Sequence, residues 1–120
     1  MVKKKILVTD AEADIVNLIK IILEKNGYEV SLADTAVEGV LKAKSELPDL
    51  ILWDEILDGL VCKILKTQEK TKHIPILIST ILPIALDENS KKYADGYLQK
   101  PFDISELPTE IQKYLNQSKV

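Results

Sequence analysis

Two short runs that are apolar on both faces constrain the fold of this chain most. They are LILWD at Leu50–Asp54 and IPILIST at Ile74–Thr80. Successive side chains of a strand point to opposite faces, so a strand that is apolar throughout must be covered on both sides. These two runs therefore predict central strands of a parallel sheet that has helices on both faces.

The remaining sequence alternates strand and helix patterns around these two runs. Strand-like segments are expected at Lys5–Asp10, Tyr28–Ala33 and Gly96–Lys100. Helical patterns are expected at Asp14–Gly27, 36–47, 59–70, 85–93, and in a last segment that ends near Leu115. Five strand–helix units predict an α/β fold with a five-stranded parallel sheet. The length of 120 residues fits a single domain, 1–120.

Residues that favour helix ends support these boundaries. Asp14 is expected to cap the start of the first helix, and Gly27 to end it. Thr35 and Glu38 have the spacing of a capping box for the second helix. Pro48 follows that helix and cannot continue it.

The last helix has two candidate starts, because Pro108 restricts where a regular helix can begin. A start capped by Asp103 and Glu106 would put Pro108 at the fifth helical position, where its ring meets a carbonyl. A start capped by Ser105 puts it in the first turn, where its missing N–H costs nothing. We therefore expect the regular helix to begin at Ser105 or later.

The composition limits the function classes. The net charge is −3 and the pI is about 5.2, so direct nucleic-acid binding is not expected, because it requires a basic surface. No segment approaches the ~20 apolar residues of a membrane helix, so no membrane association is expected. The single cysteine, Cys62, cannot form an internal disulfide and fits a cytoplasmic protein.

Polar residues gather where the expected strands end. Asp10 and Glu12 follow the first strand, Asp54 ends the third, Thr80 ends the fourth, and Lys100 ends the fifth. In an open parallel sheet these ends meet at one edge, where ligands bind. Carboxylates suit a hard divalent cation, and a lysine with a hydroxyl suits a phosphoryl group. An aspartate beside a cation can also attack phosphorus and form an acyl phosphate.

Four stretches that contain these residues resemble the receiver domain of two-component response regulators. They are KKILVTDAEADI, PDLILWD, IPILIST and YLQKPFDISEL, in this order along essentially the whole chain. The combination is more specific than any one stretch. The resemblance implies a flavodoxin-like (βα)5 fold with strand order 2-1-3-4-5.

The resemblance also implies roles for individual residues. Asp54 matches the aspartate that accepts a phosphoryl group, Thr80 the switch hydroxyl, and Lys100 the lysine that pairs with the phosphoryl group. Tyr97 matches the aromatic switch residue on the fifth strand. The bond between Lys100 and Pro101 matches a peptide bond that is cis in the family, and X–Pro bonds are where cis costs least.

The expected metal site departs from the family pattern. The family has two adjacent acids after the first strand, and here Asp10 is followed by Ala11. The remaining candidate ligands for Mg²⁺ are Asp10, Asp54 and the backbone carbonyl of Ile56, with Glu12 as a further carboxylate that could reach the site. Losing a residue that only supports a metal ligand typically lowers metal affinity ~10–100-fold. Losing a direct ligand should cost at least as much, so weak Mg²⁺ binding is expected.

Two further departures flank the site. The loop after Asp54 reaches its Asp-Gly pair, Asp58–Gly59, about three residues earlier than in the family. Tyr93 occupies a position that is usually glycine, and Pro83 lies in a slightly short segment before Tyr97. A short or irregular fourth helix is therefore expected.

These observations leave two functions open. In the first, the chain is a non-enzymatic signalling receiver that accepts a phosphoryl group on Asp54 from a histidine kinase or phosphotransfer protein. It then switches a surface that binds a downstream protein, as a monomer or weak homodimer. In the second, it is a degenerate receiver that docks proteins without phosphorylation, which Ala11 and the short loop favour. The first function is preferred, because four matching residues are retained: Asp54, Thr80, Tyr97 and Lys100. A flavin site is not expected, because the acidic DAEAD segment would repel a phosphate.

Overall fold

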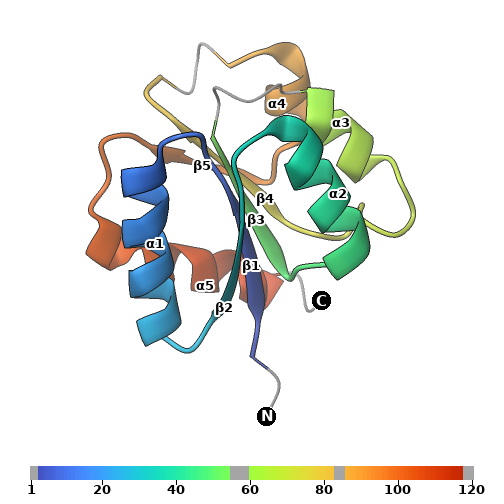
Figure 1. Ribbon diagram of the computed structural model, residues 1–120. Coiled ribbons are helices and arrows are strands. Elements are labelled where there is room, and N and C mark those ends of the chain that lie inside the picture. Colours follow the sequence, from blue (N-terminus) through green and yellow to red (C-terminus); the bar gives the residue numbers. More distant parts are fainter. Residues whose placement is uncertain (1–2, 55–59, 83–85, 118–120) are drawn as a thin grey trace.

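The chain folds around a five-stranded parallel sheet with the order β2-β1-β3-β4-β5 (Figure 1). The structure is a computed structural model that describes residues 3–54, 60–82 and 86–117. The predicted parallel sheet and its strand order are confirmed. The strands are β1 (Lys5–Thr9), β2 (Glu29–Ala33), β3 (Leu50–Asp54), β4 (Ile76–Thr80) and β5 (Gly96–Gln99).

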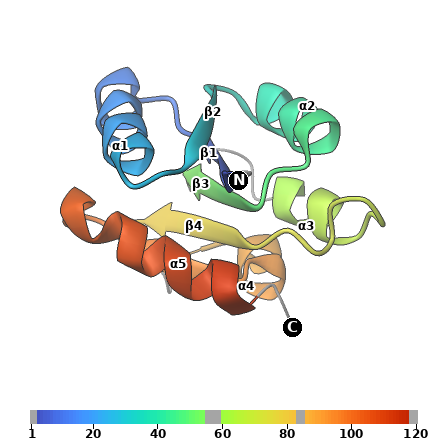
Figure 2. The same ribbon diagram turned by 90° about the horizontal axis from the view of Figure 1, so that it is seen from below.

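Helices cover both faces of the sheet, as predicted. Helices α1 and α5 lie on one face, and α2, α3 and α4 lie on the other (Figures 1 and 2). Within the described residues, no helix has the length and apolar character needed to cross a membrane. The helices are α1 (Ala13–Lys25), α2 (Ala36–Glu46), α3 (Leu60–Lys66), α4 (Glu88–Tyr93) and α5 (Leu107–Gln117), with a 3₁₀ turn η2 (Ile104–Glu106) before α5.

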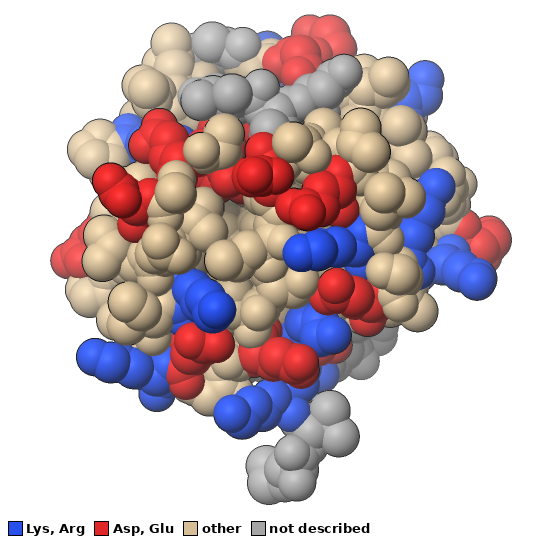
Figure 3. All heavy atoms as spheres, in the orientation of Figure 1, with Lys and Arg blue, Asp and Glu red and all other residues tan. Residues whose placement is uncertain are grey.

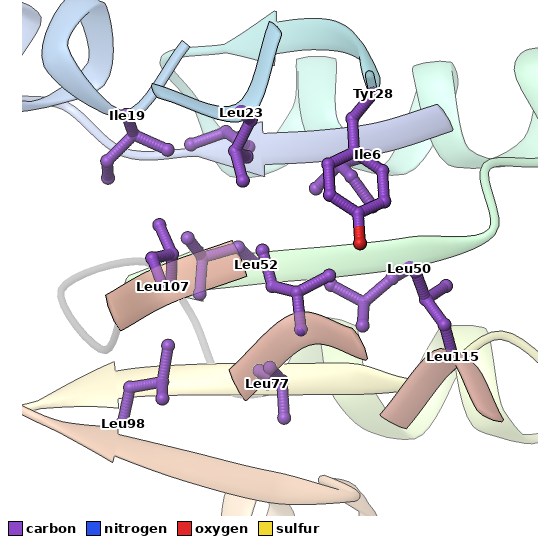
Figure 4. Packing of buried hydrophobic residues seen from close by; sticks show 12 residues of the cluster. Ile6, Ile19, Leu23, Tyr28, Leu50, Leu52, Leu77, Leu98, Leu107 and Leu115 are labelled. Carbon is purple, nitrogen blue, oxygen red and sulfur yellow. The ribbon is translucent and has the colours of Figure 1, made fainter. Parts of the chain in front are cut away.

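The face under α1 and α5 forms one of two apolar cores (Figure 4). All five residues of β3 are buried, which explains why this strand is apolar on both faces. Leu50 and Leu52 of β3 point toward this core, where Leu23 of α1 and Leu115 of α5 meet them. Burying apolar surface of this kind contributes ~25 cal/mol per Å², so the core fixes both helices against the sheet.

The opposite core, under α2 and α3, is built around Trp53. Its side chain is almost fully buried and packs against the backbone of α2 at Gly39. A Cβ at Gly39 would lie 2.7 Å from the Trp53 ring, so only glycine allows this approach. Trp53 immediately precedes Asp54, and the strand alternation therefore sends these two side chains to opposite sides.

The helix ends confirm most of the boundary predictions and correct one. Gly27 has a positive φ of 88°, and Thr35 accepts from the Glu38 N–H at 3.1 Å, both as expected. The prediction that Asp14 caps α1 is wrong, because α1 begins at Ala13 after Glu12. Asp14 instead lies in the first turn, where its negative charge interacts favourably with the positive end of the helix dipole.

The third and fourth helices are short. The helix predicted over 59–70 ends at Lys66, because threonine hydroxyls donate hydrogen bonds to carbonyl oxygens near its end. Thr67 Oγ1 donates to Lys63 O at 2.6 Å, and Thr71 Oγ1 donates to Leu65 O at 2.6 Å. Helix α4 has six residues, which agrees with the short fourth helix that was expected.

The start of the last helix follows the prediction made from Pro108. Asp103 accepts from the Ser105 N–H at 2.9 Å, and residues Ile104–Glu106 form the turn η2. The regular helix α5 begins at Leu107, so Pro108 occupies its first turn, where no N–H is required.

Candidate functional site

The carboxyl ends of β1, β3, β4 and β5 bring the predicted site residues to one edge of the sheet. The register pairs Asp54 with Ser79 on β4, and Thr80 with Gln99 on β5. Asp10 and Lys100 each follow directly after a strand of this set. These residues all lie at or just after the carboxyl ends of neighbouring strands. Their carboxylate, hydroxyl and ammonium groups are therefore on the same edge of the sheet.

Asp54 and Lys100 form an ion pair at the centre of this edge. Lys100 Nζ lies 2.8 Å from Asp54 Oδ2. The Asp54 side chain is only 1% exposed, so water screens this pair weakly. The Lys100 N–H donates to Thr80 O at 2.7 Å, which fixes the backbone of Lys100 at the end of β4. The bond between Lys100 and Pro101 is cis, as the resemblance implied.

The charges around Lys100 favour its protonated form. Burial alone would lower the pKa of Lys100, but the hydrogen bond and charge of Asp54, with Asp10 and Glu12, raise it overall. The lysine therefore stays positive at neutral pH and can offset an anion on Asp54. Figure 3 shows Asp and Glu side chains gathered in a band across the upper part of this face of the molecule.

Asp10 is the second buried carboxylate at this edge. Burial raises the pKa of Asp10, and the negative charge of Asp54 raises it further. The backbone N–H of Glu12 opposes both effects, since it donates to Asp10 Oδ1 at 2.8 Å. A bound cation would offset the charge that burial and Asp54 disfavour on Asp10.

The other predicted metal ligands do not complete a cluster. Ala11 and the Glu12 side chain are exposed, and Glu12 contacts Asp10 through its backbone N–H. Ile56 lies outside the described residues, together with the rest of the short loop, 55–59. Within residues 3–54, 60–82 and 86–117, no group of three or more His, Cys, Asp or Glu could hold a metal ion. Two carboxylates still fit Mg²⁺, which commonly keeps several waters and takes one or two carboxylates.

Thr80 and Tyr97 lie on neighbouring strands but in different environments. Thr80 is fully buried, and its Oγ1 accepts from the Leu82 N–H at 3.2 Å. The Tyr97 side chain is 37% exposed, and its hydroxyl donates to Lys91 O in α4 at 3.3 Å. Tyr97 therefore faces outward toward α4 in this structure.

A cavity that the sequence did not reveal lies next to Asp10 and Lys100. Its volume is about 150 Å³, and its walls are mostly apolar. Ile15, Leu52 and Phe102 line it from α1, β3 and the segment before α5. No pattern in the sequence signals such a space, because it depends on how α1 and the segment before α5 pack together.

The family assignment rests on a match that spans the sheet from the second residue of β1 to the end of β5. A family model described as the response regulator receiver domain matches residues 6–112. The chain belongs to the response regulator receiver domain family. Receiver domains are signalling domains of two-component systems, so this part of the resemblance is confirmed.

Curated relatives include proteins of two lengths. The receiver domain is 39% identical over 127 aligned residues to the alkaline phosphatase synthesis transcriptional regulatory protein PhoP of Bacillus subtilis, covering 98% of this chain and 50% of PhoP. The chain thus spans about half the length of the curated relatives it matches first. It is 30% identical to the polar-differentiation response regulator DivK of Brucella ovis, covering 96% of this chain and 98% of DivK.

Solved structures have the same fold. The chemotaxis response regulator CheY4 of Vibrio cholerae superimposes with a TM-score of 0.85 and 28% identity, covering 94% of this chain and 99% of CheY4. The same domain therefore matches nearly the whole of CheY4 and about half of longer regulators such as PhoP.

Proposed function

We propose that this receiver domain accepts a phosphoryl group on Asp54 from a histidine kinase or a phosphotransfer protein. The observation that supports this most is the buried ion pair of Asp54 with Lys100, at 2.8 Å, next to a second buried carboxylate. The pair holds the acceptor oxygen in a site of low solvent exposure and keeps a cation within reach of it. We also propose that the protein works in the cytoplasm and is a monomer or weak homodimer.

The transfer moves a phosphoryl group from a nitrogen to an oxygen. An Asp54 carboxylate oxygen attacks phosphorus, the P–N bond of the donor phosphohistidine breaks, and its electron pair stays on the imidazole nitrogen, which takes up a proton. Lys100 is positioned to pair with a phosphoryl oxygen after the transfer, and the Thr80 hydroxyl to donate to another. Both groups stabilise charge that spreads over the phosphoryl oxygens.

We propose a weak Mg²⁺ site beside this centre. Asp10 and Asp54 would hold the ion together with the backbone carbonyl of Ile56, which lies outside the described residues. Glu12 remains a candidate for an additional, water-mediated contact. When bound, Mg²⁺ supplies positive charge that offsets the carboxylates and the phosphoryl oxygens. The absence of a carboxylate at Ala11 is the reason to expect a high Mg²⁺ requirement.

The output of the receiver would be a change at the surface near Thr80 and Tyr97. The Thr80 hydroxyl accepts from the Leu82 N–H, so a new bond from this hydroxyl to a phosphoryl oxygen would alter how the segment after β4 is held. Tyr97 lies beside Ile78 of β4, and its hydroxyl bonds α4, which follows that segment in the chain, so the position of Tyr97 would respond to the same change. We propose that a downstream protein binds this altered surface.

The experiment that tests this function is phosphorylation by a small phosphodonor. The wild-type protein is incubated with a phosphoramidate donor at high Mg²⁺ and examined by intact-mass measurement. We expect a gain of one phosphoryl group, and no gain in Asp54→Asn, which keeps the shape of the side chain. A wild-type mass that does not change at any Mg²⁺ concentration would contradict the proposal.

That negative result would support the second candidate function, a receiver that docks proteins without phosphorylation. The specific observation in its favour is the exposed Ala11, which leaves the described part of the site without a third carboxylate. The two functions differ in one measurable respect. A docking module would bind its partner equally well as wild type and as Asp54→Asn.

A further inference from the structure

A groove between α2 and α3 lies on the side of the molecule away from β5. Its volume is about 310 Å³, and its walls are entirely apolar: Ala36, Val37, Val40, Leu41, Leu60, Val61 and Ile64. None of the site residues described above belongs to it. The groove is open to solvent. It lies between α2 and α3, which are neighbours on one face of the sheet (Figure 2).

The side chains at the rim of the groove are unusually exposed for apolar residues. The exposed fractions are 71% for Val37, 62% for Leu41 and 45% for Leu60. Val37 and Leu41 are one turn apart and form a continuous ridge on α2. A β-branched valine also lowers helix propensity, so an exposed Val37 gives the fold neither burial nor helix stability. Contiguous exposed apolar residues of this kind mark interaction sites.

Positive charge flanks the same groove. Lys44 extends the ridge of Val37 and Leu41 by one further turn, and Lys63 lies beside Leu60 and Ile64 on α3. Both lysines are exposed, and among the described residues neither has a carboxylate within ion-pair distance. Figure 3 shows lysines along the right side of the molecule, where α2 and α3 lie.

We propose that this groove binds an amphipathic helix of a partner protein, with apolar residues along one face and acidic residues beside it. Side chains at i, i+4 and i+7 of that helix would fill the groove, and its carboxylates would pair with Lys44 and Lys63. The ridge from Val37 to Lys44 is about 10 Å long at ~1.5 Å per residue, which matches about two turns of a helix. The site is independent of Asp54 phosphorylation and goes beyond the proposed function.

The charges and shape of the groove distinguish this partner from two others. A second copy that used the same groove would bring Lys44 and Lys63 toward their own equivalents, and like charges disfavour such contacts. A lipid bilayer would contact a convex apolar face, whereas this surface is hollow between two helices. A convex acidic helix fits both the hollow and the charge.

The test uses two designed helical peptides and the unphosphorylated protein. Both peptides have leucine at i, i+4 and i+7, and glutamate or lysine at the flanking positions. Binding is measured by fluorescence anisotropy, and the site is located from amide NMR shifts. We expect only the glutamate peptide to bind, with shifts on α2 and α3 and with weaker binding at high salt.

Matched variants separate the groove from other surfaces. Leu41→Gln should weaken binding about tenfold, because it removes an apolar residue from the rim. Leu18→Gln is the control, since Leu18 on α1 is 51% exposed and lies away from the groove. The double variant Lys44→Glu with Lys63→Glu reverses both charges. It should no longer bind the glutamate peptide and should bind the lysine peptide instead. This exchange of preference requires a folded protein, so misfolding cannot imitate it.

Several outcomes would overturn the inference. They are the absence of binding by the glutamate peptide at millimolar concentration, equal binding of the two peptides, or equal effects of Leu41→Gln and Leu18→Gln. Dimerisation in sedimentation that Leu41→Gln abolishes would assign the groove to a second copy. Binding to anionic phosphatidylserine vesicles that Leu41→Gln abolishes would assign it to membranes. A failure of Asp54 phosphorylation would leave this result unaffected.

Discussion

The two sides of the candidate site differ in how completely their charges are balanced. On the β5 side, the Lys100 ammonium lies 2.8 Å from the buried Asp54 carboxylate. On the β1 side, Asp10 is buried next to that same carboxylate, and Ala11 follows it where the family has a second acid. Lys100 has its pKa raised by its neighbours, and Asp10 has its pKa raised by burial and by Asp54.

This difference separates two requirements of the proposed site, holding a phosphoryl group and holding a divalent cation. Holding a phosphoryl group needs a permanent cation and a donor near the acceptor, and the β5 side provides both with Lys100 and Thr80. Holding a divalent cation needs several anionic oxygens, and the β1 side contributes fewer of them without an acid at Ala11. Under the proposed function, the site would stabilise a phosphoryl group once it is attached, and the cation would bind weakly.

The largest effect on stability should come from removing the ion pair on the β5 side. Lys100→Ala leaves Asp54 buried without its ammonium partner, which typically costs about 3–5 kcal/mol for a fully buried pair. Because the Lys100 side chain is partly exposed, we expect a loss of about 2 kcal/mol in the free energy of unfolding. Urea denaturation of the metal-free protein at neutral pH measures this value.

Lys113→Ala is the matched control for that prediction. Lys113 pairs with Glu110 at 3.1 Å on the exposed surface of α5, where an ion pair contributes at most about 1 kcal/mol. If both variants lost the same small amount, the pair of Asp54 with Lys100 would not be a buried, weakly screened interaction. The contrast between the two sides of the site would then disappear.

A smaller effect should come from restoring the missing acid. Ala11→Asp adds an anionic oxygen ligand, and we expect Mg²⁺ to bind about tenfold more tightly, comparable to the effect of supporting ligands elsewhere. The same carboxylate repels Asp10 when no metal is present, so the metal-free protein should lose stability. A titration that follows the fluorescence of the single tryptophan, Trp53, measures the affinity next to Asp54.

Ala13→Asp separates a ligand effect from a general charge effect. Ala13 is also exposed at the start of α1, so this variant adds the same charge nearby without placing it after Asp10. Equal gains in Mg²⁺ affinity from both variants would show that added charge alone is sufficient. An unchanged affinity in Ala11→Asp would show that Glu12 or the short loop already completes the site.

The sequence predicted the sheet well because its strongest signal has one physical solution. A run such as Leu50–Asp54 that is apolar on both faces must be buried on both, and β3 is buried throughout. The convergence of Asp54, Thr80 and Lys100 followed from their places at strand ends, and the strand order followed from the resemblance to receiver domains. Pro108 likewise fixed the start of α5, since proline excludes most positions in a helix.

The helix boundaries that were predicted wrongly depend on hydrogen bonds between side chains and backbone groups near the helix ends. Asp14 does not cap α1, because Asp10 already bonds the Glu12 N–H and the cap position lies at Glu12, two residues earlier than expected. Helix α3 ends early because Thr71, after the helix, bonds a carbonyl inside it. The cavity beside Asp10 and the exposed groove of α2 and α3 depend on packing between helices, which no single segment determines.

The smallest effect should come from removing the unbalanced charge of Asp10. An acid with a pKa that is higher in the folded state than its ordinary value of 3.8 destabilises the fold when it ionises. Asp10→Asn keeps the oxygen that accepts from the Glu12 N–H and removes the charge beside Asp54. We therefore expect the metal-free variant to be more stable than wild type at pH 7, by less than the stability that Lys100→Ala loses.

The dependence on pH gives this last prediction its sign. The advantage of Asp10→Asn should be full above the raised pKa of Asp10, and it should shrink as the pH falls and wild-type Asp10 takes up its proton. Below the ordinary value of 3.8 the two proteins should be equally stable. Urea denaturation with a chelator, at several pH values, measures the difference directly. A difference that stayed constant with pH would mean that Asp10 carries no excess repulsion, and that the β1 side is as well balanced as the β5 side.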